Sequence, residues 1–120
     1  MMRAANHDRS IATMGDTRVD GGVLLPLFNL DAPTTTVPIR VAQRIGYPIV
    51  PIRTQRLPRA RFCIEFCTPI YDGTEEGTTD DPAKVMIRFN QLLESWIRER
   101  PGEWWCTKRR WPTPSKHMQG

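Results

Sequence analysis

The sequence predicts an α/β fold, and three observations support that prediction. Its 120 residues are enough for one domain or for part of one. Apolar segments of strand length alternate with two segments whose apolar residues recur at helical spacing. The elements follow the order strand, helix, strand, strand, helix, and a single crossover helix predicts a parallel pair of strands.

One predicted strand and a second apolar run lie near the start of the chain. We expect residues 10–14 to form a short buried strand, with polar residues gathered at its end in 15–18. The apolar run 23–28 is the second candidate. Pro26 argues against a central strand there, because proline has no N–H to donate to the ladder.

The other two predicted strands flank a connection at 55–60. Residues 48–52 are continuously apolar and predict a short buried strand. Residues 61–66 alternate with a period of two, which predicts a strand with one solvent-exposed face.

The first predicted helix ends near Ile45. The threonines at 34–36 supply N-cap candidates, and Gly46 ends the helix. Val37, Val41 and Ile45 are four positions apart and predict one buried stripe.

The second predicted helix, over residues 83–100, has the strongest pattern in the chain. An acidic loop at 72–81 leads to Asp81 and Pro82, which provide an N-cap and a proline in the first helical position. Pro101 ends the helix. Helical spacing is kept by its apolar residues Val85, Met86, Phe89, Leu92, Leu93, Trp96 and Ile97.

The composition argues against several classes of protein. The longest apolar run has six residues, far short of the ~18–20 of a membrane span. The polar start lacks the apolar core of a secretory signal. We expect residues 1–10 to be a disordered start and 115–120 to be a tail.

The cysteines and histidines predict no metal site and no disulfide. Cys63, Cys67 and Cys106 contain no CxxC pair, and His7 and His117 lie at opposite ends of the chain. We expect reduced thiols, no metal, no cofactor and no catalytic histidine.

Charge is segregated along the chain. The net charge is +4, and arginine outnumbers lysine fourteen to three. Residues 40–61 carry six arginines and no acid, whereas residues 65–81 carry six acids and no base. The basic stretches are compatible with a solvated face or with phosphate and carboxylate binding.

Tryptophan and basic residues are concentrated in 101–111. Trp104, Trp105 and Trp111 suit a boundary between apolar and polar surroundings, at a lipid surface or at the edge of the core. Arg109 and Arg110 are expected to be exposed and to contribute little to folding. Basic residues interleaved with aromatic ones also fit single-stranded nucleic acid.

Several segments together resemble one enzyme family. Residues 14–18 and 22–28 resemble D-Q-R followed by G-V-x-V-P-F-F-G, and 32–36 resemble A-x-T. Residues 46–51, followed by Arg56, resemble G-A-P-V-V-P and the arginine after it. Residues 89–104 and 108–111 resemble N-x-x-I/L-E-x-x-I-R, then P-E-Q-W-x-W-x-H-R-R-F/W. These are motifs of the lipid A biosynthesis (late lauroyl/myristoyl) acyltransferases.

That resemblance covers residues 11–114 and implies the C-terminal portion of a mixed-sheet acyltransferase domain flanked by helices, an incomplete domain. The chain departs from the family pattern at Thr17, Asn29, Cys106 and Lys108. No matched segment contains the family's catalytic H-x-x-x-x-D/E. We therefore assign no catalytic residue and expect this chain alone to be inactive, as a truncated or degenerate copy.

The resemblance implies transfer of a fatty acyl group from acyl carrier protein to a glycolipid hydroxyl, in lipopolysaccharide biosynthesis at the cytoplasmic face of the inner membrane. Asp16 and Arg18 are the first candidates for the site, because α/β sheets place ligands at the carboxyl ends of strands. Arg56, Arg109 and Arg110 are candidates for the phosphates of the lipid or for the acidic carrier. The pocket that measures acyl-chain length is expected outside these residues. The alternative is a small basic nucleic-acid- or partner-binding module without catalysis.

Overall fold

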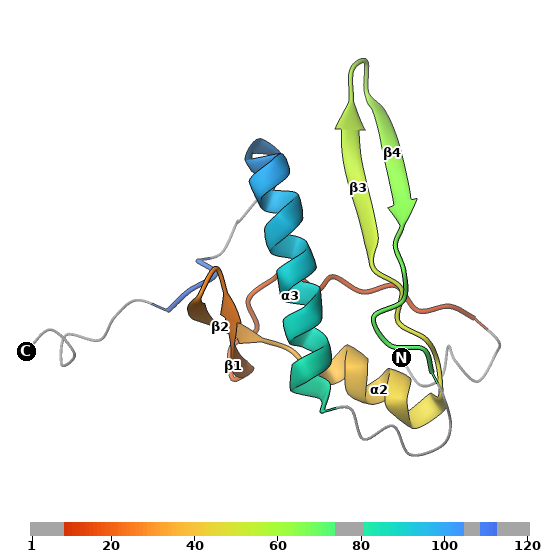
Figure 1. Ribbon diagram of the computed structural model, residues 1–120, viewed down its shortest axis with the longest axis vertical. Coiled ribbons are helices and arrows are strands. Elements are labelled where there is room, and N and C mark those ends of the chain that lie inside the picture. The colour runs from red at the N-terminus through yellow and green to blue at the C-terminus, as the bar shows by residue number, and fades with distance from the viewer. Residues whose placement is uncertain (1–8, 74–80, 105–108, 113–120) are drawn as a thin grey trace, which may run out of the picture.

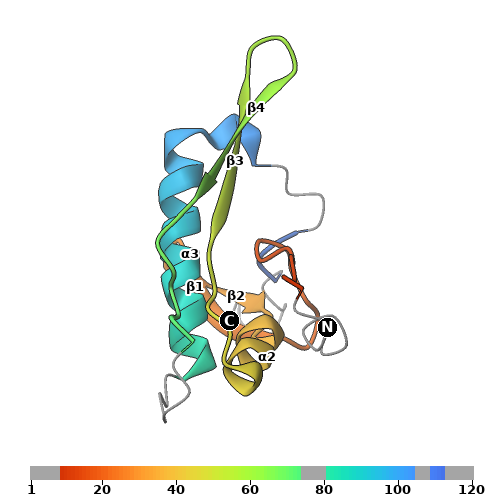
Figure 2. The same cartoon turned by 90° about the vertical axis from the view of Figure 1, so that its right-hand side faces the viewer.

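The computed structural model of the chain describes residues 9–73, 81–104 and 109–112. In these ranges the elements are β1 (Val23–Leu27), β2 (Leu30–Thr34), α2 (Val37–Ile45), β3 (Ile52–Leu57), β4 (Arg61–Phe66), α3 (Pro82–Glu99) and the short 3-10 helix η1 (Pro101–Glu103). The long helix α3 lies between two hairpins, β1–β2 on one side and β3–β4 on the other (Figure 1). The tip of the β3–β4 hairpin extends past the C-terminal end of α3 in both ribbon views (Figure 2).

The described strands form two separate two-stranded antiparallel sheets. Helices and strands are mixed along the chain, so the predicted α/β class is confirmed. The predicted parallel pair is wrong. Each strand pairs with its neighbour in sequence through a turn of two or three residues, and so short a connection allows only antiparallel pairing. In the first turn Phe28 and Asn29 both have positive φ, as a type I′ turn requires.

Two strand predictions are wrong. Residues 10–14 form no strand in the structure, and Met14 is exposed. Of the predicted strand at 48–52, Ile49 forms only an isolated bridge with Tyr71, and Ile52 is the first residue of β3. Pro48 and Pro51 interrupt that segment, because neither has an N–H to donate.

Strand β3 instead passes through the first half of the predicted connection at 55–60. Its register with β4 runs from Ile52↔Phe66 to Leu57↔Arg61, so the turn at 58–60 fixes the pairing. The strand predicted at 61–66 is confirmed as β4, but all six of its residues are exposed rather than those of one face.

Both predicted helices are confirmed. Helix α2 ends at Gly46, whose φ of 70° lies in the left-handed region. Helix α3 begins at Asp81, whose side chain accepts a hydrogen bond of 3.0 Å from the Ala83 N–H. The predicted buried stripe of α2 is wrong: Val37 is exposed, and Ile39 and Ala42 are the buried residues, because these two face the core.

The core has two parts, and both lie along α3. The first is formed by Leu25, Ile39, Ala42, Tyr71, Val85 and Met86. The second is formed by Leu27, Ala32 and Leu93, with Phe28, Phe89, Trp96, Ile97 and Trp111 packed against it. Among the described helices, none is both long and apolar enough to span a bilayer.

Candidate functional site

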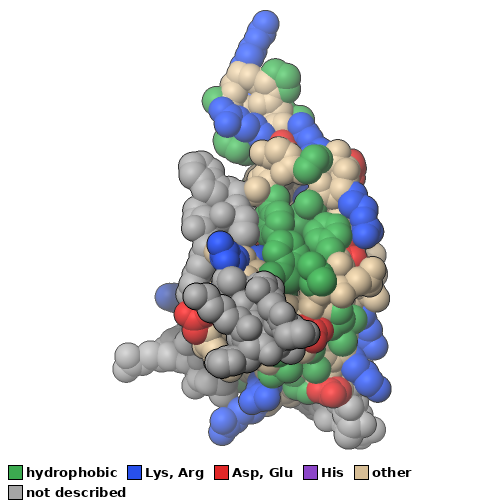
Figure 3. All heavy atoms as spheres, turned by 90° about the vertical axis from the view of Figure 1, so that its left-hand side faces the viewer, with side chains coloured by type: hydrophobic (Ala, Val, Ile, Leu, Met, Phe, Trp, Pro, Cys, Tyr) green, Lys and Arg blue, Asp and Glu red, His purple; other side chains and the backbone are tan. Residues whose placement is uncertain are grey.

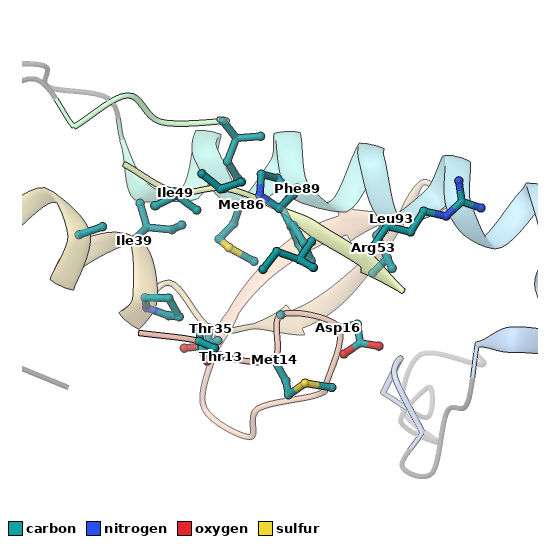
Figure 4. A pocket seen from close by; sticks show the side chains of 18 of the residues that line it. Thr13, Met14, Asp16, Thr35, Ile39, Ile49, Arg53, Met86, Phe89 and Leu93 are labelled. Carbon is teal, nitrogen blue, oxygen red and sulfur yellow. The ribbon is translucent and has the colours of Figure 1, made fainter. Parts of the chain in front are cut away.

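A cavity of about 680 Å³ lies between α3, α2, the residues leading into β3, and the segment 11–16. Ligand sites typically measure ~300–1,000 Å³. Met86, Phe89 and Leu93 project from α3 toward this space, and residues 13–16 close it from the opposite side (Figure 4). Its lining is mainly apolar, so the cavity suits a hydrocarbon group.

Gly15 allows the segment 11–16 to lie against α3. A Cβ atom at this position would come within 2.7 Å of Cε1 of Phe89, closer than carbon atoms can pack. The next residue, Asp16, is half-buried and lines the cavity. Asp16 thus reaches the cavity from a bend, not from the end of a strand as expected from the sequence.

Arg53 is a cavity residue that the sequence analysis did not single out. Its Nη1 lies 3.0 Å from Oε2 of Glu99, and its guanidinium lies 5.8 Å from the centre of the Trp96 ring. The side chain is only 11% exposed. The sequence shows that Arg53 belongs to the arginine-rich stretch 40–61, which has no acid, but it does not show that Trp96 and Glu99 of α3 are its partners.

Arg100 and Glu103 join the end of α3 to strand β3, and both line the cavity. Arg100 Nη2 lies 3.2 Å from Oε1 of Glu103 and donates to the Arg56 carbonyl at 3.1 Å. Glu103 Oε1 also accepts from the Arg56 N–H at 3.1 Å. These contacts hold the backbone of Arg56, and its side chain is exposed.

Arg18 connects the start of the chain to its C-terminal segment. Its Nε donates to Oδ1 of Asp20 at 2.9 Å, and its Nη1 donates to the Arg109 carbonyl at 3.3 Å. The structure therefore brings Arg18 and Arg109 together. Neither Arg18 nor Arg109 lines the cavity that Asp16 lines.

Arg110 is not the exposed cation that the sequence analysis expected. Its side chain is 1% exposed. It donates to the Pro33 carbonyl, and its Nη2 donates to Oγ1 of Thr34 at 2.9 Å. Arg110 therefore holds the C-terminal segment 109–112 against β2. The expectation that its side chain is exposed is wrong, and the expected small role in folding rested on that exposure.

Two of the three tryptophans in the 101–111 stretch meet edge to face. The ring centroids of Trp104 and Trp111 are 6.1 Å apart, with an interplanar angle of 82°. Trp111 Nε1 donates to the Leu27 carbonyl at 3.1 Å, and Trp104 lines the cavity. Trp105 lies outside the described residues, as do Cys106, Lys108 and both histidines.

The described cavity lining contains no histidine, and its carboxylates are those of Asp16 and Glu103. Burial and the nearby carboxylate of Glu65 raise the pKa of Cys67, against the opposing effect of Arg53. No group of three or more potential metal ligands gathers in residues 9–73, 81–104 and 109–112.

The chain also matches a family of known proteins. The family model described as bacterial lipid A biosynthesis acyltransferase matches residues 1–113. Comparison with individual curated proteins gives no significant match.

Proposed function

The chain belongs to the bacterial lipid A biosynthesis acyltransferase family, and from this premise we propose that it takes part in moving a fatty acyl group from acyl carrier protein to a lipid hydroxyl. The proposal places this reaction at the cytoplasmic face of the inner membrane, in lipopolysaccharide biosynthesis. It assigns residues 11–114 to the acyltransferase domain, between a short start and a tail.

The observation that carries this proposal is the apolar cavity along α3. We assign the fatty acyl chain to it. Ile39 and Val41 of α2 line it together with Met86 and Leu93 of α3. Burying methylene groups there is worth about 0.8 kcal/mol each. The pocket that measures acyl-chain length was expected outside these residues. The segments that line this cavity are far apart along the chain, so no local sequence pattern joins them.

The polar ends of the substrates would meet the charged groups around the cavity. Asp16, Arg53 and Arg100 line it together with the apolar residues. Arg18, Arg56 and Arg109 are assigned to the phosphates of the lipid or to the acidic carrier, since guanidinium groups bind both phosphate and carboxylate. Arg110 is not assigned to a substrate, because its guanidinium is buried against Pro33 and Thr34. Its role is to hold the C-terminal segment against β2.

A matched pair of valines on α2 tests the acyl-chain assignment. Val41 lines the cavity, whereas Val37 does not and is exposed. Val41→Trp should fill the space and weaken dodecanoate binding at least tenfold in a calorimetric titration. Val37→Trp should bind dodecanoate as the unchanged chain does. Equal affinities in all three proteins would exclude the cavity as the acyl-chain site.

Catalysis by the isolated chain is a separate question. The described cavity lining offers no histidine to act as the general base, and a general base contributes typically ~10²–10⁴-fold to the rate. We expect the purified chain to show no transfer from acyl carrier protein above the enzyme-free blank. Turnover above that blank would contradict this expectation and leave the acyl-chain assignment standing.

A further inference from the structure

The β3–β4 hairpin directs its apolar face away from α3, and at the base of that face Ile52 and Thr54 line the cavity. The register pairs Ile52 with Phe66, Thr54 with Ile64 and Arg56 with Phe62, so these six residues share one face. On that face Ile52 is 47% exposed, Phe62 and Ile64 are each 60% exposed, and Phe66 is 71% exposed. We refer to Phe62, Ile64 and Phe66, which do not line the acyl-chain cavity, as the apolar stripe.

The opposite face of the hairpin is polar, and it is the face that meets α3. Arg53 and Gln55 are half-buried there, and Arg53 is paired with Glu99 of α3. Backbone contacts of Arg56 with Arg100 and Glu103 fix the hairpin in this orientation. A hairpin stabilised by the core alone would present its apolar face to the helix, so the reversed arrangement indicates an external surface that covers the stripe.

Positive charge surrounds the apolar stripe. Arg56 lies on the same face. Arg59 lies in the turn at the tip, and Arg61 lies next to that turn on the opposite face, beyond the end of α3. Basic and hydrophobic side chains interleave at this end of the molecule in the space-filling view (Figure 3). Glu65 is the one acidic residue in 52–66, and its alternation places it on the face toward α3.

We propose that the β3–β4 hairpin docks the protein on an anionic membrane surface. The apolar stripe enters the boundary between headgroups and acyl chains, while Arg56, Arg59 and Arg61 contact the anionic headgroups. A second copy of the chain is a poorer occupant, because a two-fold contact would place the same arginine-rich patch against itself. The inference rests on the proposed function in that the acceptor is a lipid.

Vesicle co-sedimentation of the full chain tests this surface. The probes are vesicles of phosphatidylglycerol with phosphatidylcholine, and vesicles of phosphatidylcholine alone. Arg59→Gln with Arg61→Gln should weaken binding to the anionic vesicles about 25-fold, which corresponds to about 1 kcal/mol per arginine. Phe62→Ser with Phe66→Ser should weaken it at least tenfold, and high salt should weaken binding of the unchanged chain.

Matched controls come from α2 and from the other hairpin. Arg40→Gln with Arg44→Gln removes two exposed arginines of α2, and Leu30→Ser with Val37→Ser removes exposed apolar groups elsewhere. Both control proteins should bind as the unchanged chain does. Unfolding midpoints should agree among all five proteins, because every altered side chain is exposed.

Three outcomes would overturn the proposal. One is the absence of vesicle binding by the unchanged chain, and another is an equal loss in control and hairpin variants. The third is sedimentation of the unchanged chain as a dimer that Phe62→Ser with Phe66→Ser converts to a monomer, which would assign the stripe to a second copy. Because the assay measures vesicle binding, its result is independent of the dodecanoate titration. Vesicle binding through the hairpin, together with equal dodecanoate affinities of the Val41→Trp, Val37→Trp and unchanged proteins, would reject the acyl-chain assignment and keep this inference.

Discussion

The β1–β2 and β3–β4 hairpins are both two-stranded and antiparallel, but they differ sharply in burial. Leu25, Leu27, Ala32 and Thr34 are buried in the first hairpin, whereas β4 has no buried residue. Strand-forming tendency does not explain this difference, because β1 and β2 each contain a proline and β4 contains none. The burial of a two-stranded element is therefore decided by what packs on it.

Side chains from two other segments secure the β1–β2 hairpin. From α3, Asn90 Nδ2 donates to the Pro26 carbonyl at 3.2 Å, and Glu94 accepts from the Phe28 N–H at 2.6 Å. From the C-terminal segment, Arg110 and Trp111 donate to β2 and β1. The β3–β4 hairpin contacts α3 and η1 mainly through Arg53 and the backbone of Arg56.

Alanine substitution in each hairpin should give the largest contrast. Leu27 is fully buried beside Ala32 and Leu93, so Leu27→Ala should lower the free energy of unfolding by about 2–5 kcal/mol. Phe66→Ala, on the exposed strand, should change it by less than about 0.5 kcal/mol. Urea unfolding of both variants measures the difference, and similar losses would show that the two hairpins are equally part of the core.

Two arginines extend the comparison to charged side chains. Arg110→Ala leaves the Pro33 carbonyl and the Thr34 hydroxyl without a buried donor, so the free energy of unfolding should fall by about 2–3 kcal/mol. Arg56→Ala should change it by less than about 0.5 kcal/mol, because its backbone contacts remain. Thermal unfolding measures both values; a neutral Arg110→Ala would restore the view of this residue as an exposed cation.

Substitutions in the turns of the two hairpins should change the free energy of unfolding in opposite directions. Asn29 has a φ of 61°, which asparagine tolerates better than alanine, so Asn29→Ala should cost about 1 kcal/mol. Ala60 has a φ of 55°, and Ala60→Gly should relieve that strain for a net gain of about 0.5 kcal/mol. Denaturant midpoints report the sign of each change, and a loss on Ala60→Gly would contradict the positive φ.

The smallest effect concerns Cys67, just after β4. Glu65 raises the pKa of this thiol and Arg53 lowers it, and the reactive form is the thiolate. At pH 8, below the pKa, Glu65→Gln should therefore speed alkylation of Cys67 and Arg53→Gln should slow it. Both changes should be modest, because burial is the largest cause of the raised pKa of Cys67 and neither substitution is aimed at it. Mass spectrometry of the Cys67 peptide after iodoacetamide treatment gives the rates, and unchanged rates in both variants would exclude the electrostatic effect.

Predictions that depend on local signals agree with the structure. The start of α3 follows from Asp81 and Pro82, its end from Pro101, and the end of α2 from Gly46. These residues act on backbone hydrogen bonds within a few positions, so one stretch of sequence is sufficient to place them. The motifs along the chain likewise identified the family that the match over 1–113 shows.

By itself, the sequence determined the helix boundaries, the strand at 61–66 and the family. Only the tertiary structure decided which faces are buried: Ile39 and Ala42 rather than Val37 on α2, and polar rather than apolar side chains of the β3–β4 hairpin toward α3. It also decided the burial of Arg110, and it assembled the cavity from segments far apart in the chain. The physical reason is the distance along the chain over which each interaction acts. Caps and turns depend on residues that are neighbours in sequence, whereas burial depends on distant segments that pack against a side chain and exclude water.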